Sequence, residues 1–159
     1  MFSALTILSL LTVLGVLAVC VKRIPEGQVY TLRRLGKPAG TLAPGMHVVV
    51  PLIERFAHKI SISGYTLALE ERVQVEGHAK PETLRGRVWW QVLDPERADA
   101  VIDRADEMIR TRVLGALPQV AEGNQEDVRS RNLRLKQVLN GSLRDRGVLV
   151  TRVELDLAA

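Results

Sequence analysis

An uncharged apolar run at the N-terminus constrains this chain more than any other feature of its sequence. Residues 1–21 read MFSALTILSLLTVLGVLAVCV and contain no Asp, Glu, Lys or Arg. A helix of this length rises about 1.5 Å per residue and reaches across a hydrocarbon layer of roughly 30 Å. The run therefore predicts a transmembrane helix over residues 1–21. The leucines expected to contact lipid are Leu5, Leu8, Leu11, Leu14 and Leu17.

Two other interpretations of this run are a cleaved signal peptide and a lipoprotein leader. Signal peptides carry a basic region before a short apolar core. No Lys or Arg precedes this run, so a retained anchor is favoured. Cys20 is the only cysteine, which excludes an internal disulfide. It follows Val19, a poor residue for lipoprotein cleavage, but stays a candidate for acylation at the membrane edge.

The charges beside the run predict its orientation. Lys22 and Arg23 close the run, and no basic side chain precedes it. The positive-inside rule then places the following domain in the cytoplasm of a single-pass protein of the inner (plasma) membrane. That domain, residues 22–159, carries all 22 Lys and Arg and all 18 Asp and Glu, and its length suits one core. The net charge of +4 suits anionic head groups or an ordinary solvated surface.

Alternating apolar and polar residues predict strands in the first half of the domain. Residues 28–35 alternate, and residues 46–50 form a short apolar strand. Between them, residues 36–40 are rich in Gly and Pro and predict a loop, and residues 42–45 predict a turn. Residues 56–69 hold a further strand.

The second half changes period after one more strand, at residues 84–92. Leu84, Gly86, Val88, Trp90 and Val92 fall on one face of that strand, and Trp89 on the other. Pro95 suits the first turn of a helix, a break is expected near residues 103–105, and Asn124 is a candidate cap for the next helix.

The chain ends in a last predicted element, a strand over residues 148–157. Gly147 suits the left-handed position after the preceding helix. One face of the strand is predicted to carry Leu149, Thr151, Val153, Leu155 and Leu157. This order of elements predicts an α+β fold with a largely antiparallel sheet and two to three helices.

No constellation for catalysis, cofactor binding or metal binding stands out. The histidines are His47, His58 and His78, and none belongs to an HExxH motif or a close ligand cluster. There is no GxSxG elbow, which argues against a serine hydrolase, and no phosphate-binding glycine loop. Aromatic residues are only 4% of the chain, so nucleic-acid binding has no support there. The sequence predicts a protein that is not an enzyme.

Several short motifs occur in the order found in one known family. They are Pro25-Glu26-Gly27, Leu32-Arg33-Arg34-Leu35-Gly36-Lys37, Leu42-Ala43-Pro44-Gly45-Met46-His47, Pro51-Leu52-Ile53, the strand ending in Asp94-Pro95, and residues 146–155. Behind an apolar N-terminal segment, this arrangement resembles the SPFH (band 7) family of stomatins, prohibitins and flotillins. The likeness covers nearly the whole chain and is nearest to the bacterial stomatin-like (slipin) branch.

The resemblance implies a scaffold. Family members form rings or cages that enclose a membrane patch and regulate proteases, channels or lipid organisation. The implied partners are membrane lipid, other SPFH subunits, an AAA-type membrane protease or a small companion membrane protein. Members usually continue into a long coiled coil, whereas this sequence stops at residues 157–159. A monomeric membrane-tethered adaptor that joins other SPFH subunits is therefore the alternative.

Two sets of residues follow as candidate contacts. The apolar stretch before and after Pro51 predicts membrane contact, with sheet core as the alternative. Its members are Val48, Val50, Leu52 and Ile53. Helix faces rich in both signs of charge suit lateral contacts between subunits, with a solvated helix as the alternative. Those residues are Arg110, Arg112, Glu126, Asp127, Arg129 and Arg131.

Overall fold

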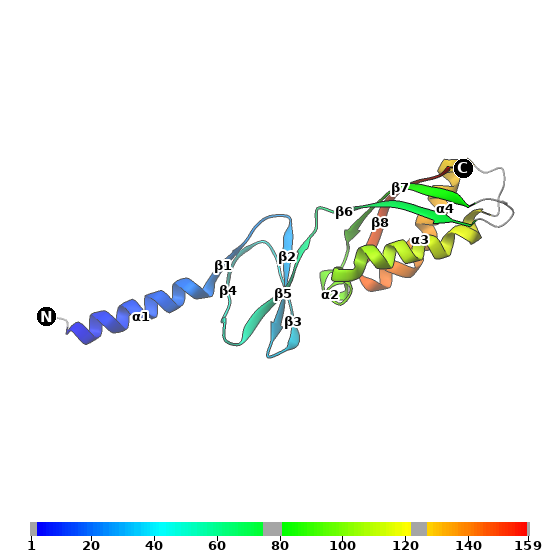
Figure 1. Ribbon diagram of the computed structural model, residues 1–159. Helices are drawn as coiled ribbons and strands as arrows, with labels where there is room; N and C mark the ends of the chain where they lie inside the picture. The colour runs from blue at the N-terminus through cyan, green and yellow to red at the C-terminus, as the bar shows by residue number, and fades with distance from the viewer. Residues whose placement is uncertain (1–2, 75–80, 122–126, 159) are drawn as a thin grey trace. The chain divides into compact units, whose positions relative to one another are not determined.

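The computed structural model describes residues 3–74, 81–121 and 127–158. The chain divides into two compact units, residues 1–60 and 61–159 (Figure 1). The first unit contains α1 (Ala4–Cys20), β1 (Val21–Ile24), β2 (Gln28–Arg34), β3 (Lys37–Leu42), β4 (Gly45–Val48) and β5 (Glu54–Ser61). The second contains β6 (Tyr65–Val73), β7 (Glu82–Val92), α2 (Pro95–Ala98), the 3-10 turn η1 (Ile102–Arg104), α3 (Ala105–Ala121), α4 (Val128–Leu143), η2 (Arg144–Arg146) and β8 (Val148–Ala158). The α+β class with antiparallel sheets is thus confirmed.

The N-terminal helix is shorter than the sequence predicts. α1 has 17 residues, about 25 Å at the usual rise, which is less than the roughly 30 Å of a hydrocarbon core. It ends at Cys20, because the backbone extends at Val21 to begin β1. Within the described residues, no helix combines the length and the apolar character that crossing a membrane requires. The predicted transmembrane helix over residues 1–21 is therefore not found.

The first unit is built from two small sheets. β1 pairs antiparallel with β4, and the other sheet has the order β3-β2-β5. The loop predicted at residues 36–40 is wrong, because Leu35 and Gly36 alone make the turn and β3 follows at once. Both turn residues have positive φ, 50° and 81°, as tight hairpin turns require. Pro38 is tolerated in β3 because β3 is an edge strand.

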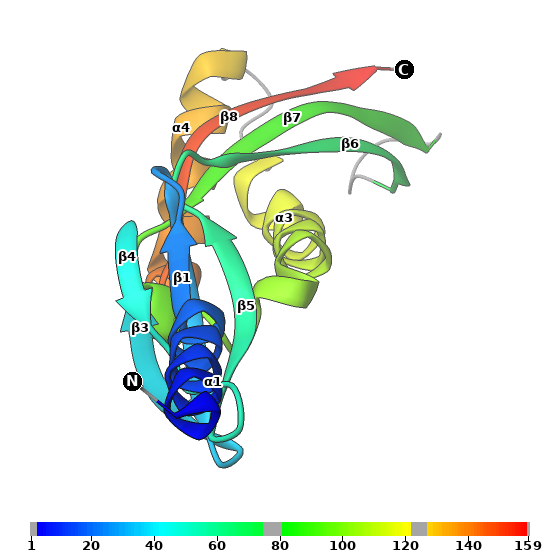
Figure 2. The same cartoon turned by 90° about the vertical axis from the view of Figure 1, so that its left-hand side faces the viewer.

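The second unit is one antiparallel sheet, ordered β6-β7-β8, with α3 and α4 covering its apolar face (Figure 2). The predicted face of β7 is confirmed, since Leu84, Val88, Trp90 and Val92 are all buried. The helices contribute Ile109, Val113, Ala116, Leu117, Val120, Leu135, Leu139 and Leu143 to the same core. This burial accounts for most of the unit's stability.

The two adjacent tryptophans separate as the alternation predicts. Trp90 is buried, stacks on Tyr65 with ring centroids 4.3 Å apart, and donates from Nε1 to Asp106 Oδ1 at 3.0 Å. Trp89 is half-buried on the opposite face, where the Arg152 guanidinium lies 5.2 Å from its ring centroid. The pair therefore marks the core side and the outer side of the sheet.

The predicted face of the last strand is half wrong, because β8 contains a bulge. Trp89 pairs with Arg152 and Trp90 with Val150, so Thr151 has no cross-strand partner in β7. The Thr151 hydroxyl donates instead to the Trp89 carbonyl at 3.1 Å. One extra residue exchanges the faces. Val153 and Leu155 are buried as predicted, but before the bulge Val150 is buried rather than Leu149.

The signals at the helix ends have mixed outcomes. Pro95 opens α2 as predicted, and the Asp94 carboxylate accepts from the Glu96 N–H at 3.0 Å. The expected break is the turn η1. Gly147 adopts φ 74°, and a Cβ there would lie 2.3 Å from the Asp94 carbonyl oxygen, so only glycine fits. The predicted cap Asn124 lies outside the described residues.

Candidate functional site

The surface of α1 is apolar all round. No residue of Ala4–Cys20 is buried, and each of the five predicted lipid-contact leucines is more than half exposed. A helix that is apolar on every side is stable only when other apolar matter covers it. Cys20, at its C-terminal end, is half-buried and free.

The β1–β4 ribbon continues this apolar surface from the end of α1. Val21 lies opposite Val48, and Arg23 opposite Met46, so these four side chains share one face. Val21, Met46 and Val48 are all exposed on it. The Val49 N–H donates to the Cys20 carbonyl at 2.8 Å, which holds the end of α1 beside the end of β4.

A second apolar group lies where the β2–β3 turn meets the segment before β5. Leu52 is 92% exposed and Leu35 is 80% exposed, and the Leu35 N–H donates to the Ile53 carbonyl at 3.1 Å. A pocket of about 490 Å³ lies here. Its lining combines these apolar side chains with basic ones, namely Arg33, Arg55 and His58. Apolar tips beside basic groups suit the boundary between acyl chains and head groups.

Leu35 belongs to this surface, although the sequence patterns did not single it out as a membrane contact. Met46, which is 73% exposed, belongs to the apolar run before Pro51 that the sequence predicts to contact the membrane. Leu35 has φ 50°, a conformation that costs a leucine roughly 1 kcal/mol or more. Hairpin turns of this kind favour Asn or Asp before Gly. The available signal was therefore the leucine before Gly36. An apolar side chain in an exposed hairpin turn is not needed for the turn or for the core, which indicates an external contact.

A polar network holds the segment that carries the second apolar group. Arg34 donates to Glu54 Oε1, from Nε at 3.1 Å and also from Nη2. The Val50 N–H donates to Glu54 Oε2 at 3.3 Å. The hydrogen bond from Arg34 has the largest effect on the Glu54 carboxyl. Together with the hydrogen bond from the Val50 N–H, it holds the pKa of that carboxyl below its usual range. The residues between Val50 and Glu54 are thus fixed while Leu52 and Ile53 stay exposed.

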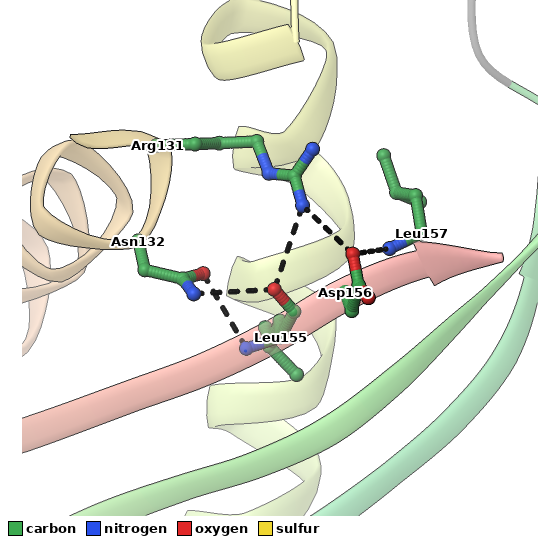
Figure 3. Close-up of polar contacts among 5 residues, drawn as sticks. All are labelled: Arg131, Asn132, Leu155, Asp156 and Leu157. Atoms are coloured by element: carbon green, nitrogen blue, oxygen red, sulfur yellow. Dashed lines mark hydrogen bonds and ion pairs between the residues drawn. The ribbon is translucent and has the colours of Figure 1, made fainter. Parts of the chain in front are cut away.

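Among the residues predicted for lateral contacts, Arg110 and Arg112 lie on α3, and Arg129 and Arg131 lie on α4. Arg110 pairs with Glu71 at 3.2 Å. Arg131 donates to the Leu155 carbonyl at 3.5 Å and pairs with Asp156 at 3.6 Å (Figure 3), and its side chain is only 18% exposed. Arg112 lines a pocket with Arg104 and Arg146.

Two further predicted contact residues lie at the start of α4: Asp127 is its N-cap, and Arg129 is in its first turn. Asp127 and Arg129 are exposed there, and Glu126 lies outside the described residues. Two of the six residues, Arg110 and Arg131, therefore have partners within the unit that carries them.

Two asparagines of α4 cover the free edge of β8, a feature that sequence reasoning missed. The Asn132 amide donates to the Leu155 carbonyl at 3.2 Å and accepts from the Leu155 N–H at 3.4 Å (Figure 3). The Asn140 amide does the same at Val150, at 3.0 and 2.7 Å. Each amide replaces a neighbouring strand. The available signal was two asparagines eight positions apart, each three residues before a leucine of the apolar stripe, Leu135 and Leu143.

The described residues include no group of His, Cys, Asp and Glu side chains that could hold a metal ion. A sequence model of the SPFH domain / Band 7 family matches residues 22–158. This chain belongs to that family. SPFH proteins are typically membrane-associated scaffolds and are generally non-catalytic. The narrower assignment to the slipin branch stays a prediction.

Proposed function

We propose that this SPFH protein is a membrane-associated scaffold that assembles laterally and organises or regulates membrane proteins or lipid microdomains. The observation that carries the proposal is the exposed apolar surface of the first unit: α1, the β1–β4 face, and the tips at Leu35 and Leu52. Covering one leucine side chain is favourable by about 1.5–3 kcal/mol. A surface with this many exposed large apolar groups is stabilised by the hydrocarbon of a bilayer.

The charges beside this surface support contact with the cytoplasmic leaflet of the inner membrane. Lys22, Arg23, Arg33 and Arg55 are exposed on the same unit. Each basic side chain near an anionic leaflet contributes about 1 kcal/mol of attraction. With the apolar surface of the first unit against the bilayer, these groups would lie at the anionic head groups of that leaflet.

The proposed partners are other SPFH subunits and a membrane protein under their control, such as an AAA-type protease or a small companion protein. The alternative function is a tethered adaptor that joins other SPFH subunits without assembling alone. One observation favours it: Arg110 and Arg131 are paired within their own unit. These two arginines are then less available for ion pairs with a second copy of the chain.

Insertion of the first unit can be tested with an environment-sensitive fluorophore. In a Cys20→Ser background, single cysteines at positions 35, 52 and 133 are labelled with NBD in lipid nanodiscs. Leu133 is the matched control, because it is an exposed leucine on α4 of the second unit. We expect blue-shifted emission and quenching by nitroxide lipids at positions 35 and 52 but not at 133. Equal emission at all three positions would refute membrane contact.

Assembly is tested separately by the particle mass of the full-length chain in native-membrane discs. A large, discrete multiple of 17.6 kDa supports the scaffold. A monomer or dimer contradicts self-assembly and supports the adaptor. Co-expression with a longer SPFH protein then shows whether this chain joins its particles.

A further inference from the structure

A basic pocket on the second unit is not used by the proposed function. It has a volume of about 370 Å³ and lies where η1, α3 and η2 come together. We call it the arginine pocket. Its lining residues are Val101, Arg104, Glu107, Met108, Thr111, Arg112 and Arg146.

Helix spacing and one glycine bring the arginines together. Arg104 is the last residue of η1, and Met108 and Arg112 follow it on α3 at intervals of four residues. Since residues three or four apart are neighbours on a helix, these three side chains share one face. Arg146 comes from the end of η2, and Gly147 fixes its place. The Gly147 carbonyl accepts from the Leu93 N–H at 2.8 Å, so the backbone there is packed against the end of β7. The backbone that carries Arg146 is therefore held in place.

The three guanidinium groups have no acidic partner within the described part of the chain. Neither an ion pair nor a side-chain hydrogen bond joins Arg104, Arg112 or Arg146 to another described residue. Arg110, on the same helix, pairs with Glu71 at 3.2 Å. Guanidinium groups that share a pocket repel one another, and here one carboxylate, Glu107, opposes them. The pocket thus carries an excess of positive charge.

The charge and shape of the pocket select a class of ligand. We propose that the arginine pocket binds a phosphate monoester, as a free small molecule or as a lipid head group. Three arginines and one carboxylate match the charge of about −1.5 to −2 that a phosphomonoester has at pH 7. The planar guanidinium fork binds phosphate oxygens in pairs. Val101 and Met108 are half-buried and supply an apolar wall for the carbons next to the phosphate.

Four of the lining side chains then have defined effects, while Arg104 adds positive charge at the end of η1. Arg112 and Arg146, from α3 and η2, would hold the phosphate oxygens. Glu107 would repel them, and its carboxylate suits a ligand hydroxyl instead. The Thr111 hydroxyl donates to the Glu107 carbonyl at 2.9 Å, which leaves its oxygen as an acceptor. Removing Glu107's charge should therefore tighten binding of bare phosphate, whereas removing an arginine should weaken it.

The test uses the full-length chain in an uncharged detergent, titrated with inorganic phosphate in a calorimeter at fixed ionic strength. We expect saturable binding that weakens roughly tenfold in Arg112→Gln and in Arg146→Gln, and strengthens a few-fold in Glu107→Gln. Arg144→Gln is the matched control, because Arg144 lies on the same turn η2 as Arg146 but does not line the pocket.

The outcomes separate the site from general charge and from misfolding. No saturable binding by the native chain, or an equal loss in Arg144→Gln, overturns the proposal. The gain expected for Glu107→Gln is a result that unfolding would not produce. Competition distinguishes the ligand sources. If phosphatidic acid in the micelles displaces phosphate at a lower concentration than glycerol 3-phosphate does, the ligand is a lipid head group. If glycerol 3-phosphate displaces phosphate at the lower concentration, the ligand is a free monoester.

Discussion

The two units of this chain place their large apolar side chains in opposite ways. In the second unit they point inward, between one sheet face and two helices. In the first, the buried apolar side chains of the described residues are Ile24, Leu32, Val49 and Ile60, while leucines at the turns are exposed. The second unit therefore encloses most of its large apolar side chains, whereas the first leaves many of them exposed. That difference supports the membrane contact proposed for the first unit.

The polar side chains of the two units also have different roles. The second unit covers the backbone of β8 with Asn132 and Asn140, so that edge is closed to other strands. The first unit uses Arg34 and Glu54 to hold a segment whose apolar tip stays exposed. One arrangement completes an interior, and the other presents a surface.

The largest expected effect comes from the closest approach inside the second unit. A Cβ at Gly86 would lie 1.9 Å from the Glu154 carbonyl oxygen, so Gly86→Ala forces β7 and β8 apart. We expect a loss of roughly 3–5 kcal/mol in the free energy of unfolding. Tryptophan fluorescence during urea unfolding measures it, because the chain's two tryptophans, Trp89 and Trp90, both lie in this unit.

The matched control is Gly115→Ala on α3, where a Cβ would meet nothing within 4 Å. Replacing a helical glycine with alanine should stabilise by about 0.5–1 kcal/mol. Equal effects at Gly86 and Gly115 would contradict the packing of β7 against β8.

A pair of leucine truncations compares the two units directly. Leu139 is buried beneath the sheet and Leu52 is exposed. Leu139→Ala should cost about 2–5 kcal/mol of unfolding free energy, whereas Leu52→Ala in detergent should change it by less than about 0.5 kcal/mol. Thermal unfolding followed by circular dichroism tests both. A large loss from Leu52→Ala would show that the first unit buries this side chain internally.

Closure of the β8 edge gives a smaller effect. Asn140→Ala leaves the Val150 N–H and C=O without the amide that binds them at 2.7 and 3.0 Å. An unsatisfied buried backbone group costs about 1–3 kcal/mol, and hydrogen exchange at Val150 should accelerate accordingly. Asn132→Ala should cost less, because its hydrogen bonds are longer and Arg131 also donates to the Leu155 carbonyl. The reverse order would disprove this account.

The smallest expected effect is the loss of the stability that the Glu54 carboxylate contributes, as the pH falls. Since the folded pKa of Glu54 is lowered from 4.5, the unfolded state binds more protons in acid. The stability from this carboxylate is then complete above about pH 4.5 and is lost as pH falls through the folded value. The Val50 amide, which donates to Glu54, should shift in NMR spectra over that range. The shift should vanish in Glu54→Gln, and a shift that persists would point to another group.

Much of the second unit was predictable because its signals are local. The alternation in β7, Pro95 at a helix start and Gly147 at a left-handed position each depend on a few neighbouring residues. The bulge at Thr151 was not predictable, because it exists only in the pairing of β8 with β7. The hairpin at Leu35 was missed for a related reason: Gly and Pro indicate a loop and do not exclude an edge strand.

The sequence alone determined the apolar N-terminal run, the family motifs and the inward face of β7, because each depends on local hydropathy and backbone preference. Only the tertiary structure decided that α1 ends at Cys20, that Leu35 joins Ile53 at an exposed tip, and that Arg146 lines the same pocket as Arg104 and Arg112. Those features depend on which segments meet, and contacts between segments far apart in the chain leave no periodic trace in the sequence.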